Sequence, residues 1–312
     1  MKKIFTLIAA VMLCGTNAMA QEQPTPVYFN DFETTDGLTI VGAGSIVEDN
    51  TKGYGKVFQN VTSTAPRQNY LLLPDNVLSH SATTQQMTIG FWVNAANAGE
   101  SVAYLWAPMF MAYGAAPANG TNTWPMLACQ YRGVIQVNCA GWCDFVDAQN
   151  KAGVNTLYHG DTDWLADHKW HYYTVVFDGE DAKVFFDGIL KNEWDATVSY
   201  TIDGNTITGT TQKGLFSNGA DLKYICLGGN QAWNWADNDP GFAFDDFAIY
   251  DKALTKDQID AIITAKGTTT AIQTVKAANS AAASVRYNLA GQQVDAAYKG
   301  VVIENGKKML VK

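Results

Sequence analysis

Long apolar runs and an excess of basic charge are both missing from this sequence of 312 residues. After the first 20 residues, no stretch is apolar enough to span a bilayer, so no transmembrane segment is expected there. Lysine and arginine number 21 against 30 aspartates and glutamates, which gives a net charge of −9. Because negative charge repels phosphate backbones, nucleic acid is not an expected partner.

The chain starts with a segment typical of a secretory signal peptide, residues 1–20, "MKKIFTLIAAVMLCGTNAMA". Two lysines precede an apolar run from Ile4 to Leu13, and small residues end the segment at Ala20. Without Lys2 and Lys3 the basic count falls to 19 against 30 acidic residues, a net charge of −11. The sequence therefore predicts a secreted protein, in the extracellular space, on the outer surface or in the periplasm.

Cysteine is scarce after this segment, where only Cys129, Cys139, Cys143 and Cys226 remain. An oxidising compartment favours disulfides or buried thiols, and four cysteines allow three pairings, which the sequence leaves open. The segment Cys139-Ala-Gly-Trp-Cys143 has no second close pair of cysteines or histidines, so a zinc site is not favoured.

Between Val27 and Asp251, short runs of β-branched and aromatic residues alternate with clusters of Gly, Asn and Asp. This pattern predicts an all-β fold in which two antiparallel sheets pack face to face. Turns are expected at Asp178-Gly179 and Asp187-Gly188, because Asp-Gly tolerates the positive φ of a tight hairpin.

One amphipathic helix is expected, over "LTKDQIDAIITAKG". Thr255 and Gln258 have the spacing of a capping box, and Gly267 ends the helix. Its apolar stripe consists of Ile259, Ile262 and Ile263.

The composition changes after this helix, and the predicted domains follow from that change. Residues 21–267 form the sandwich, and the small polar residues 268–284 form a linker. Residues 285–312 form a β-like tail that is too short to build much of a core alone.

Four segments resemble the laminin-G-like branch of the concanavalin A-like lectin/glucanase superfamily. They are "NDFE", "MTIGFWVN", "HKWHYYTVVFDGEDAKVFFDG" and "GFAFDDFAIYDKALTKDQIDAI". The resemblance implies a jelly-roll sandwich used for binding carbohydrate or protein, with Trp92 and Trp170 in its core, and in many relatives a structural calcium ion. The tail resembles the C-terminal tails of secreted Bacteroidetes proteins, some of which are sorting signals for export to the cell surface.

A calcium ion needs six to eight oxygen ligands, and the first and last strands of the sandwich offer oxygen atoms of this kind. Asn30 and Asp31 lie on the first strand, and Asp245 and Asp246 lie on the last. If these strands are neighbours, the four residues are the predicted metal ligands. The alternative is that one aspartate of each pair faces solvent.

Catalytic motifs are missing. A glucanase of this superfamily would carry carboxylates as Glu-x-Asp-x-x-Glu, whereas Glu193-Trp194-Asp195 and Asp245-Asp246 differ in spacing. The four histidines form no His-Glu-x-x-His motif, and no serine lies in a nucleophile elbow. The segment His159-Gly-Asp161-Thr-Asp163 is either a solvated connection or a metal or sugar loop. No catalytic residue is therefore predicted.

The segment "NQAWNWADNDPGF", which starts at Asn230, combines Trp233 and Trp235 with amides and carboxylates. An indole stacks on the C–H face of a sugar while planar polar groups bond its hydroxyls, although either indole could instead seal the sandwich edge. The predicted ligand-binding residues are Trp233, Trp235, Asn230, Gln231, Asn234, Asp237, Trp142 and Trp164.

These observations favour a secreted or surface-associated, lectin-like module without catalytic activity, with a glycan or polysaccharide as its partner. The first alternative is an adhesion or structural protein that binds another protein, such as one on a cell surface. The second is a polysaccharide hydrolase or lyase of the same fold.

Overall fold

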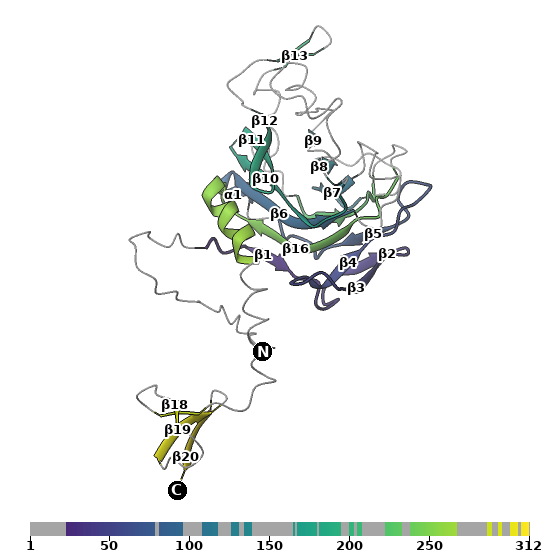
Figure 1. Ribbon diagram of the computed structural model, residues 1–312. Coiled ribbons are helices and arrows are strands. Elements are labelled where there is room, and N and C mark those ends of the chain that lie inside the picture. The colour runs from purple at the N-terminus through teal and green to yellow at the C-terminus, as the bar shows by residue number, and fades with distance from the viewer. Residues whose placement is uncertain are drawn as a thin grey trace.

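The structure is a computed structural model. It describes residues 23–78, 81–95, 108–117, 126–130, 134–138, 165, 167–179, 181–194, 200–202, 205–207, 222–232, 238–266, 286–288, 293–294, 300–304 and 307–311. Two antiparallel sheets pack face to face and enclose one core, which confirms the predicted sandwich (Figure 1).

The larger sheet has eight strands, in the order β12-β11-β10-β6-β16-β4-β3, with β1 paired to β16. Their bounds are β1 Tyr28–Asn30, β3 Ser45–Asp49, β4 Gly55–Gln59, β6 Gln86–Asn94, β10 His171–Asp178, β11 Asp181–Phe186, β12 Ile189–Trp194 and β16 Ala243–Tyr250. The first and last strands of the sandwich are thus neighbours, as the sequence predicted, with Asn30 opposite Phe247.

The second sheet has six strands, in the order β2-β5-β15-β7-β8-β9. They are β2 Thr39–Val41, β5 Tyr70–Leu72, β7 Pro108–Tyr113, β8 Met126–Gln130, β9 Val134–Asn138 and β15 Tyr224–Leu227. A short helix, α1 (Ser81–Thr84), precedes β6, and β13 (Tyr200–Ile202) pairs with β14 (Asn205–Ile207) in a separate hairpin.

Aromatic side chains fill the space between the sheets. Phe91 of β6 meets Phe110 of β7 edge to face at 6.2 Å, which joins the two sheets. Along β16, Phe244 and Phe247 both face this core although they are three residues apart. A bulge between Asp245 and Ala248 explains this exception to strict alternation, since it inserts one extra residue into the strand.

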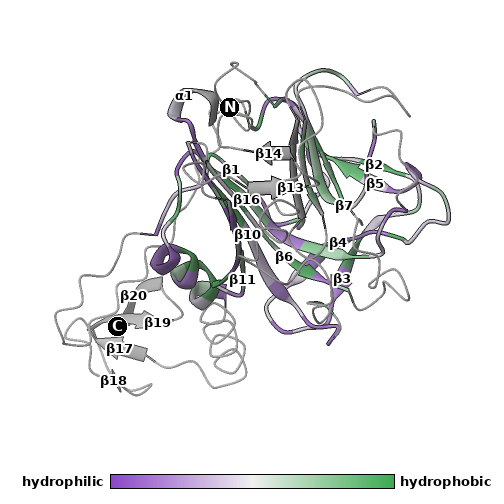
Figure 2. Ribbon diagram, turned by 90° about the horizontal axis from the view of Figure 1, so that it is seen from above, coloured by the Kyte–Doolittle hydropathy of each residue, from purple (hydrophilic) through white to green (hydrophobic). Residues whose placement is uncertain are grey.

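The predicted helix spans residues 256–266. Its capping box is confirmed, because the Thr255 amide donates to Gln258 Oε1 at 2.9 Å and the Gln258 amide donates to Thr255 Oγ1 at 3.3 Å. The three isoleucines pack against the outer face of the larger sheet. Figure 2 shows hydrophilic and hydrophobic residues along this helix, beside β10 and β11.

Both predicted hairpin turns exist, one of them shifted. Asp187 and Gly188 have φ of 51° and 72° and connect β11 to β12, as predicted. The other turn lies one residue later than predicted, because Asp178 still pairs with Asp181 and Gly179, at φ 60°, is the first turn residue.

The tail forms a four-stranded antiparallel sheet in the order β18-β17-β19-β20. The strands are β17 Arg286–Asn288, β18 Gln293–Val294, β19 Gly300–Glu304 and β20 Lys307–Val311. The predicted linker, residues 268–284, lies outside the described part of the chain, and the domain boundaries stay predictions. None of the helices in the described ranges has the length and apolar character to cross a membrane.

Two of the cysteines are described, and both are buried free thiols. Cys129 lies in the core between the sheets, whereas Cys226 lies in a separate cluster with Tyr70, Met111 and Tyr113. This places the two thiols on opposite faces of the smaller sheet, so they do not pair with each other. Cys139 and Cys143 lie outside the described residues.

Candidate functional site

The segment from Asn230 to Pro240, here called the tryptophan loop, is described at both ends and not in its middle. Asn230 and Gln231 are described, whereas the other predicted ligand-binding residues lie outside the described ranges: Trp142, Trp164, Trp233, Asn234, Trp235 and Asp237. What the structure defines is how the two ends of the loop are held.

The first end is anchored on Tyr113 of β7. This tyrosine is fully buried on the outer face of the smaller sheet, and its hydroxyl donates to Asn230 Oδ1 at 2.9 Å. The Ala232 amide donates to the same hydroxyl at 3.4 Å. Burial raises the pKa of Tyr113 well above its usual value, so the hydroxyl keeps its proton and stays a donor. Asn230 is only 1% exposed and is an anchor of the loop, while its predicted role in ligand binding stays a prediction.

The second end is anchored by Asp239, which is fully buried. Its Oδ2 accepts the backbone amides of Gln68 at 2.8 Å and Asn69 at 2.9 Å, just before β5. Its own amide donates to Ser63 Oγ at 3.0 Å. Burial raises the pKa of Asp239, and the hydrogen bonds it accepts offset part of that rise. This carboxylate therefore fixes the loop to a segment about 170 residues earlier in the chain.

Asn60 provides a third set of hydrogen bonds to the same region. It is 1% exposed, and its Nδ2 donates to the carbonyls of Asn69 at 3.1 Å and Pro240 at 2.9 Å, and to that of Gly228. The chain approaches closely here: a Cβ atom on Gly229 would lie 2.6 Å from the Asn69 carbonyl oxygen. The adjacent glycines are thus required for this packing.

Sequence reasoning had missed Tyr113, Asp239, Asn60 and Asn69. Each forms contacts over a long sequence separation, so no local spacing marks them. The one signal that could have found them is the Gly228-Gly229-Asn230 step at the end of a strand, since adjacent glycines often permit another backbone to approach. Together they form a preformed stem that presents the loop.

The predicted metal ligands are brought near one another, but a lysine lies among them. Lys266 Nζ lies 2.5 Å from Asp245 Oδ2 and 2.7 Å from Asp246 Oδ2. At the end of β1, Asn30 Oδ1 and Asp31 Oδ1 accept the amides of residues 32 and 33, at 2.8 and 3.2 Å, and Asp31 lies just after the strand and not on it as predicted. Within the described ranges, no cluster of three or more acidic, His or Cys residues is arranged to hold a metal ion. As they lie here, these residues do not fit calcium.

The electrostatics of the aspartate pair follow from its burial. Burial and, to a smaller extent, the charge of Asp246 raise the pKa of Asp245 to about 7, although Lys266 acts in the opposite direction. Burial also raises the pKa of Asp246.

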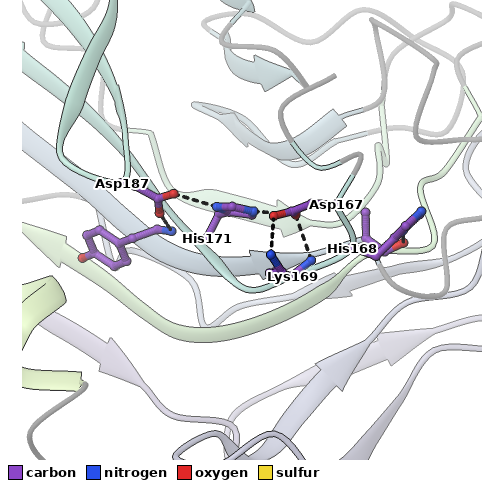
Figure 3. A network of polar contacts seen from close by, with 7 residues as sticks. Asp167, His168, Lys169, His171 and Asp187 are labelled. Carbon is purple, nitrogen blue, oxygen red and sulfur yellow. Dashed lines mark hydrogen bonds and ion pairs between the residues drawn. The ribbon is translucent and has the colours of Figure 1, made fainter. Parts of the chain in front are cut away.

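A histidine network lies on the same sheet, at the start of β10 (Figure 3). His171 Nδ1 lies 2.6 Å from Asp187 Oδ2, and Nε2 lies 2.8 Å from Asp167 Oδ1. Asp187 Oδ1 also accepts the amide of Tyr172 at 2.9 Å. Because both ring nitrogens face carboxylate oxygens, the geometry favours the doubly protonated imidazolium. His171 is thus engaged in structural contacts, and His159 lies outside the described residues.

Comparison with protein families identifies the superfamily to which the chain is similar. The family model described as the concanavalin A-like lectin/glucanases superfamily matches residues 65–260. No curated protein is significantly similar to the chain in sequence.

Among solved structures, the chain is similar to domain 4 of AbnA, a GH43 extracellular arabinanase from Geobacillus stearothermophilus, in complex with arabinotriose. The identity is 14% and the TM-score 0.45, and the match covers 77% of this chain and 98% of that one. The binding domain of Botulinum neurotoxin DC in complex with rat synaptotagmin II is 12% identical with a TM-score of 0.41. That match covers 73% of this chain and 46% of the other, so it spans about half the length of the toxin domain.

Proposed function

The chain belongs to the concanavalin A-like lectin/glucanase superfamily, and on that basis we propose that it is a lectin-like module that binds a glycan or polysaccharide without catalysing a reaction. We also propose that the protein is secreted or surface-associated, because residues 1–20 have the pattern of a signal peptide.

The observation that carries this proposal is the stem of the tryptophan loop. Buried hydrogen bonds of Tyr113 and Asp239 fix the two ends, and the sequence between them supplies two indoles, three side-chain amides and a carboxylate. A loop that is held before binding loses less conformational entropy when its ligand arrives. Aromatic faces with adjacent polar groups match a sugar, which has an apolar C–H face and a polar rim.

Two clusters of acid–base groups, one around Lys266 and one around His171, support binding over catalysis. The adjacent carboxylates Asp245 and Asp246 are both paired with Lys266. Both ring nitrogens of His171 are engaged with aspartates. A general acid or base needs access to substrate, and these groups are instead committed to contacts within the protein.

A glycan array tests the proposal. We expect binding to a defined set of glycans, and we expect Trp233→Ala or Trp235→Ala to weaken it at least about tenfold, near 1.4 kcal/mol, without lowering the melting temperature. Phe29→Ala is the control, since Phe29 is an aromatic on β1 with 48% exposure.

Three outcomes would contradict parts of the proposal. Normal glycan binding by both tryptophan variants would remove the loop as the site. A silent array together with binding to a surface protein would favour the adhesion alternative. Release of reducing ends from a polysaccharide panel would make the protein a hydrolase.

A further inference from the structure

The bulge in β16 sets the geometry of an unusual carboxylate pair. Asp246 occupies the bulge with φ of 46°, a left-handed conformation that is uncommon for a residue other than glycine. The side chain of Asp245 is 1% exposed and that of Asp246 is 24% exposed. Because of the bulge, both carboxylates reach the same point on the outer face of the larger sheet, where the helix of residues 256–266 packs.

Lys266, the last residue of that helix, fills this point. Its ammonium lies 2.5 and 2.7 Å from the two carboxylates and 4.6 Å from the centre of the Tyr54 ring. Tyr54 also stacks on Trp170, with ring centres 4.3 Å apart and planes 12° apart. Two carboxylates and an aromatic face form a cage for a cation. The position also suits the helix, whose C-terminal end attracts positive charge.

The surroundings of this cage are strongly negative. Asp245 Oδ1 is buried and accepts no hydrogen bond from the described residues. The charges of Asp31 and Glu33 also act on Asp246, which adds to the negative potential around the pair. One ammonium group therefore balances a concentration of acidic oxygens that would otherwise repel one another.

A metal ion and this ammonium group would exclude each other. Calcium binds oxygen at about 2.3–2.6 Å, which is close to the separation between Lys266 Nζ and the two carboxylates. An ion bound by both aspartates would thus stand where the ammonium now stands, and two cations cannot share that point.

We propose that Lys266 is a built-in cation that takes the place of a divalent metal ion between Asp245 and Asp246 and fastens the end of the helix to the sheet. The pair Asp245 and Asp246 then needs no calcium, and a divalent cation site is created there only when the ammonium is removed. This inference does not depend on the proposed binding of glycan.

The test compares Lys266→Met with Lys256→Met in the full chain. Lys256 lies on the same helix and pairs with Asp260, but its side chain is 58% exposed. Removing one partner of a buried ion pair is costly, so we expect Lys266→Met to melt about 5–10 °C below Lys256→Met. The wild-type melting temperature should be the same in excess calcium and in excess chelator. Calcium should raise that of Lys266→Met, and adding Asp245→Asn should remove this response.

Terbium, a luminescent analogue of calcium, gives a second readout because Tyr54 and Trp170 lie close enough to sensitise it. We expect saturable luminescence from Lys266→Met and none from the wild type. If Lys266→Met does not fold, the double variant with Lys266→Met and Asp246→Asn should fold, because it removes the repulsion between the two carboxylates. The melting temperatures of the wild type in calcium and in chelator then still test the proposal. A calcium-dependent rise in wild-type melting temperature that Asp246→Asn removes would overturn the proposal, as would a Lys266→Met variant as stable as Lys256→Met.

Discussion

The hydroxyl of Tyr113 donates to Asn230 Oδ1 at 2.9 Å, and this buried hydrogen bond ties strand β7 to the first residue of the tryptophan loop. The two residues are 117 positions apart in sequence. The bond places Asn230, the start of the loop, on the outer face of the smaller sheet.

Tyr113→Phe keeps the ring and removes this hydrogen bond. We expect a loss of about 1–2 kcal/mol in the free energy of unfolding, measured by urea denaturation, because the bond is buried. Glycan affinity should fall about three- to tenfold, since a less restrained loop must be ordered on binding. Tyr224→Phe is the matched control, because Tyr224 lies directly opposite Tyr113 on β15. Equal effects of the two changes would contradict the anchoring role.

Asp239→Ala should be more damaging than Tyr113→Phe. It leaves the amides of Gln68 and Asn69 without their carboxylate acceptor, which we expect to cost about 2–4 kcal/mol of unfolding free energy. Asp239→Asn retains one acceptor oxygen of similar shape and should cost less. The exposed Asp36 provides a control, and Asp36→Ala should change stability by less than about 0.5 kcal/mol. A stable Asp239→Ala protein would show that this anchor is dispensable.

The histidine network predicts a pH dependence of stability. Burial lowers the pKa of His171, but hydrogen bonds to Asp187 and Asp167 outweigh it and raise the pKa above 6.5. A raised folded pKa means that the stabilisation is complete below about pH 6.5, the unfolded value, and is lost as the pH rises through the folded pKa.

Asp167 sets the lower limit of this stabilisation. Burial raises its pKa, but hydrogen bonds from His171 and the Lys169 amide outweigh this and lower the pKa below 3.8. Its contribution is therefore present above about pH 4 and is lost as the pH falls through the folded pKa. The network should be strongest between about pH 4 and pH 6.5.

His171→Gln tests this window. The difference in unfolding free energy from wild type should be near 1 kcal/mol at about pH 5.5, a small value because the carboxylates are partly exposed, and should shrink as the pH rises through the raised pKa of His171. His168→Gln is the control, since His168 Nδ1 contacts the carbonyl oxygen of Ala95 at 3.0 Å instead of a carboxylate. A difference that stays constant across this range would argue against an ionised network.

A fragment from Gln21 to Gly267 should unfold cooperatively on heating. The described core residues all lie within it, and the capped helix ends before Gly267. Calorimetry checks this expectation, with the chain from Gln21 to Lys312 as the reference. An insoluble fragment, or one without a sharp transition, would show that the tail belongs to the domain.

Features that depend on neighbouring residues could be predicted from the sequence. Thr255 and Gln258 are three residues apart, so their reciprocal hydrogen bonds follow from helix geometry. The turn at Asp187-Gly188 follows from the positive φ that these residue types tolerate. The alternation of apolar residues likewise predicted two sheets with one core.

The faces of the sheets were less predictable. Trp92 was expected in the core, and it is buried, but it lies beneath the C-terminal helix on the outer face of the larger sheet. Trp170 also lies on this outer face, in contact with Tyr54. A strand whose outer face is covered by a helix buries side chains on both faces. Its local sequence therefore does not show on which face a large aromatic side chain lies.

The sequence by itself determined the β-sandwich, the capped helix and the polar, tryptophan-containing segment after Gly229, because propensity, alternation and turn chemistry act over a few residues. Only the tertiary structure decided that Asp245 and Asp246 meet Lys266. The same is true of Asp239, which accepts two amides from a segment about 170 residues earlier in the chain, and of Asn230, which serves as an anchor. The physical reason is that charge pairing and buried hydrogen bonds depend on distances in space, which a bulge, a sheet register and a docked helix set together.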